Sequence, residues 1–228
     1  MKILKKLRIR NKYYFAATYR RKKLDSLLEK NKHYYQGFVL DIGGRNRGKF
    51  QKPKHKTERW TFADIEKSHS PDIVLDIADM KIIHSKSVDV VNSIEVFEHV
   101  ANPLKGLREC YRILKPNGIM ILSMPFLFQI HSDPYDFQRW TAEKLKRELE
   151  TLGFIIERFE IMGRYFTVLA EMNRALIKSF PKVLKYISFL SFPLLDLLIK
   201  LDHLKIIKTH PTLGSFHGGY FIIAKKRA

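Results

Sequence analysis

Short, nearly continuous apolar runs recur along this chain and alternate with segments of helical periodicity. Such runs predict buried strands at residues 38–42, 60–64, 72–76, 88–94, 119–123, 154–161 and 219–224. Helices are predicted from Pro103 to just before Pro116 and from the capping residue Thr141 through Leu152, while 45–59 is predicted to be a short helix at most, followed by a loop. Because near-continuous apolar strands are typical of sheets buried on both faces, we predict an α/β fold with a mostly parallel sheet between helices.

Residues 1–36 precede this alternation and predict a basic helical arm. Tyrosine and leucine positions in it follow helical spacing, and the four consecutive basic residues 20–23 are predicted on the opposite side of that helix. We therefore divide the chain into this arm and a single domain spanning 37–228.

A long apolar segment, 164–208, interrupts the domain before its last strand. Within it, Pro193 is predicted to divide the mostly apolar stretch 183–201 into two helical pieces. In the second piece the leucines are predicted to cover one broad side, with Asp196, Lys200 and His203 on the other. A helix of this kind can lie at a membrane surface, or it can pack on the sheet or on a second subunit.

The composition favours one folded domain with an uneven charge distribution. The chain has 228 residues, 45% of them hydrophobic, which excludes a disordered or low-complexity protein. A single cysteine, Cys110, cannot form an internal disulfide, and no apolar run is long enough to span a membrane, so we expect a cytoplasmic protein.

The net charge is +19, and residues 1–60 alone hold nineteen Lys or Arg against four acidic residues. This asymmetry predicts a basic surface for phosphate groups, either of nucleic acid or of an anionic membrane.

Glycines and acids follow the first three predicted strands. Residues 41–45 form a glycine-containing turn after the first strand, Asp64 ends the second, and Asp79 lies shortly after the third. In an open parallel sheet these positions meet at one edge, where glycines allow a ligand to approach closely and a carboxylate can bind both ribose hydroxyls. Arg45 occupies the place of the second glycine of a dinucleotide fingerprint, so the pattern favours a nucleoside without phosphates.

Four motifs together resemble those of class I S-adenosylmethionine-dependent methyltransferases, in particular the methyltransferase type 11 group. They are VLDIGG at 39–44, the ribose-binding acid at 64, VDVV followed by EVFEHV between 88 and 100, and RILKPNG at 112–118. The resemblance covers about 37–161 plus the last strand, and it implies a Rossmann-like, doubly wound, mostly parallel seven-stranded sheet with helices on both faces.

The resemblance also implies a cofactor, S-adenosylmethionine. It would be bound by residues that follow the first four strands: Asp41, Gly43, Gly44, Arg45, Asp64, Asp79 and Glu95. Arg45 stands where the family usually has a glycine, and we expect its guanidinium to pair with the carboxylate of the cofactor.

The loop after the fifth predicted strand carries the candidate catalytic residues. The stretch HSDPYDFQRWT at 131–141 resembles a motif of a methyltransferase subgroup associated with cell-surface polysaccharide synthesis. His131 is expected to act as a base near neutrality, with Asp133 or Asp136 orienting it. The alternative is a structural loop, with Asp133 in a turn and Arg139 paired with Asp136.

Glu95, Glu98 and His99 form a second polar cluster, after the fourth predicted strand. Their spacing resembles a divalent-metal site of ubiquinone-pathway O-methyltransferases, but acids are also favoured where a helix begins. We therefore assign no metal ligand.

These features predict an S-adenosylmethionine-dependent methyltransferase whose acceptor is a hydroxyl of a glycan or lipid-linked saccharide. The alternatives are an RNA or DNA methyltransferase, a small-molecule methyltransferase, and a non-catalytic methyltransferase-like adaptor. Nucleic acid is less favoured because the fourth strand lacks an Asn/Asp-Pro-Pro-Tyr/Phe motif. We expect 1–36 and 183–208 to contact an anionic membrane at its cytoplasmic face, with a homodimer as the alternative use of the apolar segment.

Overall fold

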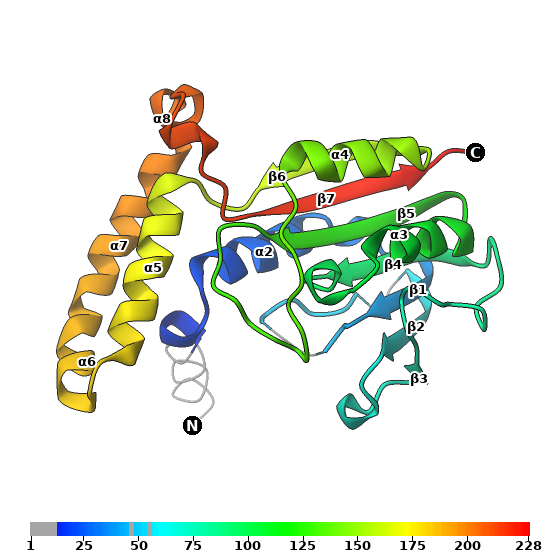
Figure 1. The fold of residues 1–228 in the computed structure, drawn as a ribbon, viewed down its shortest axis with the longest axis horizontal. Coiled ribbons are helices and arrows are strands. Elements are labelled where there is room, and N and C mark those ends of the chain that lie inside the picture. The colour runs from blue at the N-terminus through cyan, green and yellow to red at the C-terminus, as the bar shows by residue number, and fades with distance from the viewer. Residues whose placement is uncertain (1–12, 46–47, 54–55) are drawn as a thin grey trace.

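A seven-stranded sheet lies at the centre of the structure, a computed structural model that describes residues 13–45, 48–53 and 56–228 (Figure 1). Its strands are β1 (Gly37–Ile42), β2 (Thr57–Asp64), β3 (Ile73–Val74), β4 (Val88–Ile94), β5 (Leu114–Pro125), β6 (Phe154–Ile161) and β7 (Gly219–Lys226). Their order across the sheet is β3-β2-β1-β4-β5-β7-β6. β7 runs antiparallel to both of its neighbours, whereas the other pairs are parallel. The predicted Rossmann-like, mostly parallel sheet is confirmed.

Helices cover both faces of the sheet, because successive side chains of a strand point to opposite faces. α3 (Pro103–Ile113) and α4 (Ala142–Thr151) pack on one face, and α2 (Tyr19–Lys30) packs on the other. On β5, for example, Met120 belongs to the core beneath α3 and α4, while Ile121 belongs to the core beneath α2. The remaining short helices of the core are η1 (Lys32–Tyr34), η2 (Lys67–His69) and η3 (Phe97–His99).

Element boundaries differ from the prediction most clearly at β3, before β2 and at β5. β3 contains two residues rather than five, and the described part of 45–59 contains no helix before β2 begins at Thr57. β5 begins at Leu114, which pairs with Val88, so the Pro-Asn-Gly turn expected before the strand lies within it. Asn117 adopts φ 64°, a left-handed conformation that asparagine tolerates at low cost.

The sequence predicted that the four consecutive basic residues of α2 lie on the side of the helix opposite its apolar residues. In the structure, two of them are instead engaged in ion pairs. Arg20 is 4% exposed and pairs with Glu95 at the edge of the sheet. Arg21 pairs with Asp25 at 3.0 Å. The first twelve residues of the predicted arm lie outside the described residues, so the basic surface expected there is not described.

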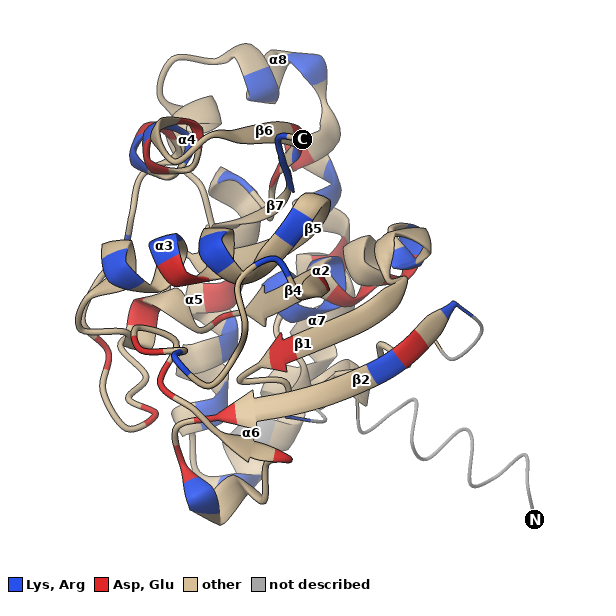
Figure 2. Cartoon of the chain, turned by 90° about the vertical axis from the view of Figure 1, so that its right-hand side faces the viewer, with Lys and Arg blue, Asp and Glu red and all other residues tan. Residues whose placement is uncertain are grey.

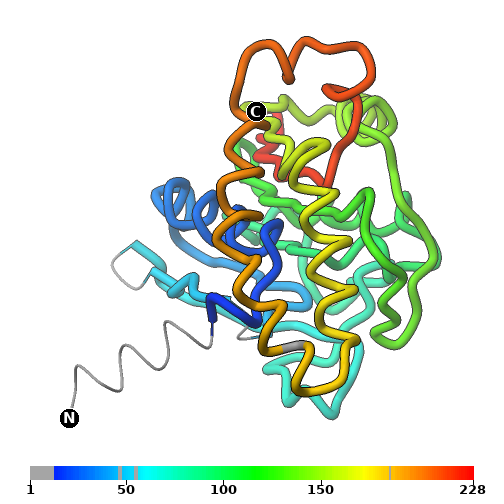
Figure 3. The backbone as a smooth tube through the Cα atoms, turned by 90° about the vertical axis from the view of Figure 1, so that its left-hand side faces the viewer, coloured from blue at the N-terminus to red at the C-terminus, as the bar shows by residue number. Residues whose placement is uncertain are grey.

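The apolar insertion forms a helical hairpin at one end of the sheet (Figure 1). It consists of α5 (Tyr165–Ser179), α6 (Lys182–Ser188), η4 (Phe189–Ser191), α7 (Phe192–Leu198) and η5 (Ile199–His203), followed by α8 (Lys205–Thr209) and η6 (Leu213–Ser215). Figure 3 shows α5 lying beside the returning segment from α6 to η5. Pro193 lies in the first turn of α7, so the predicted division at this residue is confirmed.

The second helical piece does not keep the predicted division between a leucine side and a polar side. Asp196 accepts a hydrogen bond from the Tyr14 hydroxyl and so faces the N-terminal segment rather than solvent. Leu195, which the pattern had placed on the open apolar side, is 8% exposed and packs with Phe192 and Ala170 in a small core. Within the described residues, no helix is both long and apolar enough to cross a bilayer.

Candidate active site

The turn after β1 lies at the carboxyl edge of the sheet, where acidic residues gather at the arrowheads of β1 and β2 (Figure 2). Gly43 has φ +66°, and a Cβ there would lie 2.7 Å from the Val96 side chain. A Cβ on Gly44 would lie 2.0 Å from the carboxyl carbon of Asp41. Glycine is therefore the residue that fits at both positions.

Asp41 is the centre of a buried hydrogen-bond network beneath this turn. Its carboxylate accepts from the side-chain amide of Asn92 at 2.6 Å and from the Trp60 indole at 2.9 Å. The Lys52 ammonium lies 2.9 Å away. These three donors, none of them predicted from the sequence, hold the carboxylate and thereby the turn above it.

Asp64 ends β2, as predicted, and lies at the same edge. One carboxylate oxygen accepts the backbone N–H of Glu66 at 2.9 Å, and the other lies 3.0 Å from His69 Nδ1. Asp79 lies on the loop after β3, is exposed, and pairs with Lys81 at 3.2 Å. A carboxylate at the end of β2 beside a turn without side chains fits the ribose and amino-acid ends of S-adenosylmethionine.

Arg45 joins three loops at this edge. Its guanidinium lies 2.9 Å from His69 Nε2 on the loop after β2 and pairs with Asp133 on the loop after β5. The sequence suggested the cofactor carboxylate as the partner of Arg45. In the structure, the guanidinium interacts instead with two protein side chains, His69 and Asp133.

Glu95 follows β4 and has φ 57°, an unusual conformation for a residue with a side chain. Its carboxylate pairs with Arg20, which α2 brings from the opposite end of the sequence. The Arg20 guanidinium also stacks on the Phe128 ring at 4.2 Å, and burial lowers its pKa to about 10. No local sequence pattern indicates this contact, because the two residues are 75 positions apart.

Glu98 is the most deeply buried acid of the site, with a fully buried side chain. Burial raises its pKa to about 7. Among the described residues, neither of its carboxylate oxygens has a hydrogen-bond partner. One of them lies 3.7 Å from His99 Nε2 and 3.8 Å from His131 Nε2.

His131 is held in the loop after β5 by Asp136. The backbone N–H of His131 donates to the Asp136 carboxylate at 2.9 Å, and the ring Nδ1 lies 3.4 Å from the same group. Arg139 donates to Asp136 at 2.7 Å and lowers the pKa of that carboxyl. Burial lowers the pKa of His131, which favours the neutral imidazole near pH 7. Of the two acids expected to orient His131, the structure thus brings Asp136 to it and pairs Asp133 with Arg45.

The predicted polar cluster after β4 divides into two groups. Glu95 pairs with Arg20, whereas Glu98 and His99 meet His131. Glu98, His99 and His131 each offer one ligand atom, and these atoms lie within 4.8 Å of one another. One carboxylate and two imidazoles are a ligand set that a divalent transition metal could use. The sequence had joined the first two of these residues to Glu95 and missed His131 as their neighbour.

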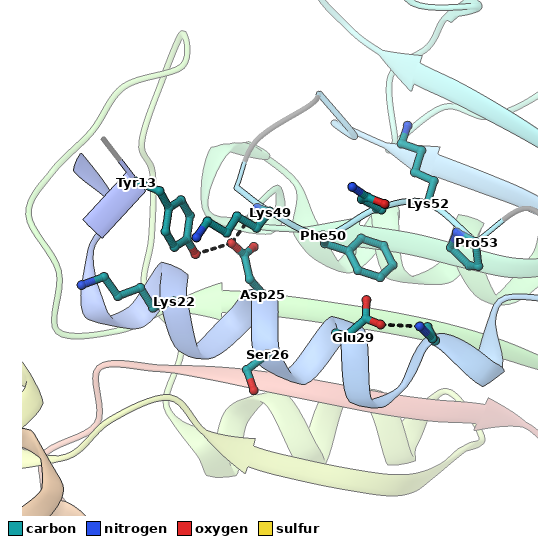
Figure 4. A pocket seen from close by; sticks show the side chains of 11 residues that line it. Tyr13, Lys22, Asp25, Ser26, Glu29, Lys49, Phe50, Lys52 and Pro53 are labelled. Atoms are coloured by element: carbon teal, nitrogen blue, oxygen red, sulfur yellow. Dashed lines mark hydrogen bonds and ion pairs between the residues drawn. The ribbon is translucent and has the colours of Figure 1, made fainter. Parts of the chain in front are cut away.

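Two hollows lie elsewhere on the described surface, and none of the predicted site residues lines either of them. One, of about 720 Å³, lies between α2 and residues 49–53 and is lined by four lysines around Asp25 and Glu29 (Figure 4). The other, of about 650 Å³, lies between the hairpin and the pair α4 and β6.

Comparison with known proteins points to one family. The sequence profile of the methyltransferase domain matches residues 45–122. A protein of Mycolicibacterium smegmatis named as an S-adenosylmethionine-dependent methyltransferase is 35% identical over 77 residues, which are 31% of this chain and 30% of the relative. A ubiquinone biosynthesis O-methyltransferase of Actinobacillus pleuropneumoniae is 30% identical over 70 residues, 31% of this chain and 29% of the relative. The chain thus spans less than a third of the length of these curated relatives.

The whole fold is similar to that of an S-adenosylmethionine-dependent methyltransferase from Archaeoglobus fulgidus. The TM-score is 0.55 at 18% identity, and the similarity covers 96% of this chain and 99% of the other. At this identity the likeness concerns the fold alone. The profile match, however, starts at Arg45 and ends within β5. It includes Asp64, Glu95 and Glu98 but neither the glycines at 43–44 nor the loop of His131. Together with the strand order, it supports assigning the chain to the class I S-adenosylmethionine-dependent methyltransferases.

Proposed function

We propose that this protein transfers a methyl group from S-adenosylmethionine to a hydroxyl of a glycan or lipid-linked saccharide. The observation that carries the proposal is His131, an imidazole with a lowered pKa that lies beside the buried Glu98 and is held by Asp136. A hydroxyl must lose its proton as it attacks, and a neutral, oriented imidazole is suited to accept that proton.

When bound, S-adenosylmethionine supplies a methyl group on a positively charged sulfur. Gly43, Gly44 and Asp64 would hold the cofactor at the edge of the sheet, as argued above. His131 Nδ1 lies 3.2 Å from the carbonyl oxygen of Gln129, so a proton on Nδ1 leaves Nε2 free to accept one from the acceptor hydroxyl. His131 would accept the proton that the acceptor hydroxyl loses on methylation.

The hollow of about 650 Å³ supports an acceptor that carries an anionic group. Its charged lining has four cations and three acids, and two histidines lie among them: Lys23, Lys146, Arg164, Lys208, Glu143, Glu160, Asp202, His203 and His217. Asp202 is already engaged by backbone N–H groups at the start of α5, which leaves an excess of positive charge toward the hollow. The hollow adjoins the loop of His131, because the backbone N–H of Leu127 donates to the His217 carbonyl at 3.1 Å. The phosphate groups that join a saccharide to a lipid have the matching charge.

The similar ubiquinone biosynthesis enzyme is named as an O-methyltransferase, which supports an oxygen acceptor for this chain as well. A small aromatic or aliphatic hydroxyl compound is therefore the second candidate acceptor. We place the reaction in the cytoplasm, where S-adenosylmethionine would be available, and at the inner face of the membrane.

Transfer of labelled methyl groups to a panel of acceptors tests the proposal. We expect incorporation into lipid-linked or free saccharides, in the ether-linked form that withstands mild base. Incorporation into RNA instead would overturn the assignment of the acceptor. Tight cofactor binding without transfer to any acceptor class would favour the adaptor alternative.

The variant His131→Ala tests the proton transfer. We expect turnover to fall by roughly a hundredfold or more with little change in cofactor affinity, since the imidazole acts on the acceptor and not on the cofactor. His84→Ala is the matched control, because His84 is exposed on the loop between β3 and β4. Equal turnover of the wild type and His131→Ala would show that the loop at 131–141 has a structural role and that His131 is not the base.

A further inference from the structure

Seven apolar residues form a continuous exposed stripe along the returning segment of the hairpin. They recur at alternating intervals of four and three residues: Val183, Ile187, Leu190, Leu194, Leu197, Leu201 and Leu204. Their exposure ranges from 36% for Leu201 to 80% for Leu190. A second exposed set, Leu169, Met172 and Leu176, lies on α5, which runs beside this segment (Figure 3). Exposed apolar surface of this extent marks an interaction site.

The acids of the hairpin are turned inward and occupied. The segment 164–210 has three, and each accepts hydrogen bonds from the protein interior. Glu171 accepts the backbone N–H of Arg20 at 2.9 Å. Asp196 accepts the Tyr14 hydroxyl, and Asp202 accepts three backbone N–H groups at the start of α5, at 2.8 to 3.0 Å.

The basic residues of the same segment lie mostly outside. Lys182, Lys200, Lys205 and Lys208 are exposed, while Arg174 is buried and donates to the backbone carbonyls of residues 14, 15 and 17. The described surface of the hairpin therefore presents apolar side chains bordered by positive charge. Buried hydrogen bonds from Arg174 and to Asp202 fix the orientation of the helices, so the fold determines which side of the hairpin is exposed.

We propose that this face of the hairpin docks on an anionic lipid bilayer. Leucines facing the acyl boundary and lysines at the headgroups are the arrangement by which helices lie in a membrane interface. A second copy of the chain is a poorer occupant, because paired helical seams are stabilised by flanking charges of opposite sign. Here two copies would bring lysine against lysine, since Glu171, Asp196 and Asp202 are all engaged internally. The docking surface does not depend on the methyl-transfer reaction.

Vesicle flotation with the full chain tests this proposal. We expect binding to vesicles that contain phosphatidylglycerol, weak binding to phosphatidylcholine alone, and release as the salt concentration rises. The double variant Leu194→Glu/Leu197→Glu should lower binding by about tenfold or more, because two carboxylates would have to enter the acyl boundary. Lys200→Glu/Lys205→Glu should lower binding to the anionic vesicles by about fivefold or more.

The matched control is Ile82→Glu, since Ile82 is 65% exposed against 67% for Leu194 but lies on the loop between β3 and β4. It should bind vesicles like the wild type. S-adenosylmethionine affinity, measured in parallel, should be unchanged in every variant and so reports an intact fold. Absence of flotation at low salt would overturn the proposal, as would an equal loss in Ile82→Glu. A dimer that Leu194→Glu/Leu197→Glu dissociates, without vesicle binding, would assign the face to a second copy.

Discussion

Glu98 illustrates how burial rather than residue type determines the chemistry of a side chain. The carboxyl is enclosed between the strand end and the loop of His131, and burial raises its pKa from 4.5 to about 7. Arg20 and Arg139 oppose this rise but do not cancel it. The protonated form is therefore favoured in the folded protein over much of the range in which an exposed glutamate is ionised.

We expect Glu98→Gln to stabilise the protein at pH 8 and to change little at pH 5. Because the pKa is higher in the folded state, the wild type loses stability as the pH rises from about 4.5 to 7, and the loss amounts to about 3 kcal/mol. Glutamine does not ionise and avoids this loss. Urea denaturation at the two pH values measures the difference.

The exposed Glu150→Gln is the control and should change the free energy of unfolding at neither pH. A Glu98→Gln variant less stable than the wild type at pH 8 would contradict this account. It would mean that the ionised carboxylate is stabilised, for example by a cation held with His99 and His131.

At the scale of elements, two leucine-rich helical segments of similar composition have opposite roles. Helix α2 buries Leu24, Leu27 and Leu28 against β1, β4, β5 and β7. The segment from α6 to η5 buries only a few side chains and exposes most of its leucines. A helical pattern shows that a helix has an apolar side, but whether that side is covered depends on what the fold brings against it.

Leu24→Ala should lower the free energy of unfolding by about 2–5 kcal/mol, because Leu24 is fully buried and the cavity would remain. Leu194→Ala, at a residue that is 67% exposed, should change it by less than about 0.5 kcal/mol. Urea denaturation of both variants under the same conditions makes the comparison. Equal losses would show that the hairpin face is covered in solution.

At the scale of the whole molecule, the site is assembled from loops that are distant in the sequence. Arg45, His69 and Asp133 meet from the loops after β1, β2 and β5, and Arg20 reaches the same edge from α2. His69 Nδ1 lies 3.0 Å from one Asp64 carboxylate oxygen, and the other oxygen accepts the backbone N–H of Glu66. We therefore expect cofactor binding to replace the His69 contact of Asp64 with a ribose hydroxyl.

Asp64→Ala should weaken S-adenosylmethionine binding by about 1–3 kcal/mol, because the ribose hydroxyls lose their acceptor. His69→Ala should leave affinity unchanged or raise it, since it removes the group that competes for the carboxylate. Isothermal titration calorimetry measures both. Equal weakening in the two variants would place His69 in the binding site itself, and no binding by the wild type would contradict the cofactor assignment.

Much of the fold could be predicted from the sequence because its determinants are local. Apolar runs such as 88–94 and caps such as Thr141 act over a few residues, and the strands and helices they predict are present. The glycine turn at 43–44 and the acid at the end of β2 could be located because, in a parallel sheet, residues that follow the strands meet at one edge.

Contacts between distant residues could not be predicted in this way. The sequence places His131, Glu98 and Arg20 on three separate segments, and only the packing of α2 and the β5 loop on the strand ends brings them together. Long-range contacts also determine which side of the hairpin is exposed. Hydrogen bonds from Arg174 and to Asp196 hold the hairpin against the N-terminal segment. The sequence alone thus determines the elements and the edge at which the site forms, because these follow from local periodicity and turns. Which side chains meet there, and which leucines stay exposed, follows from long-range packing that only the tertiary structure specifies.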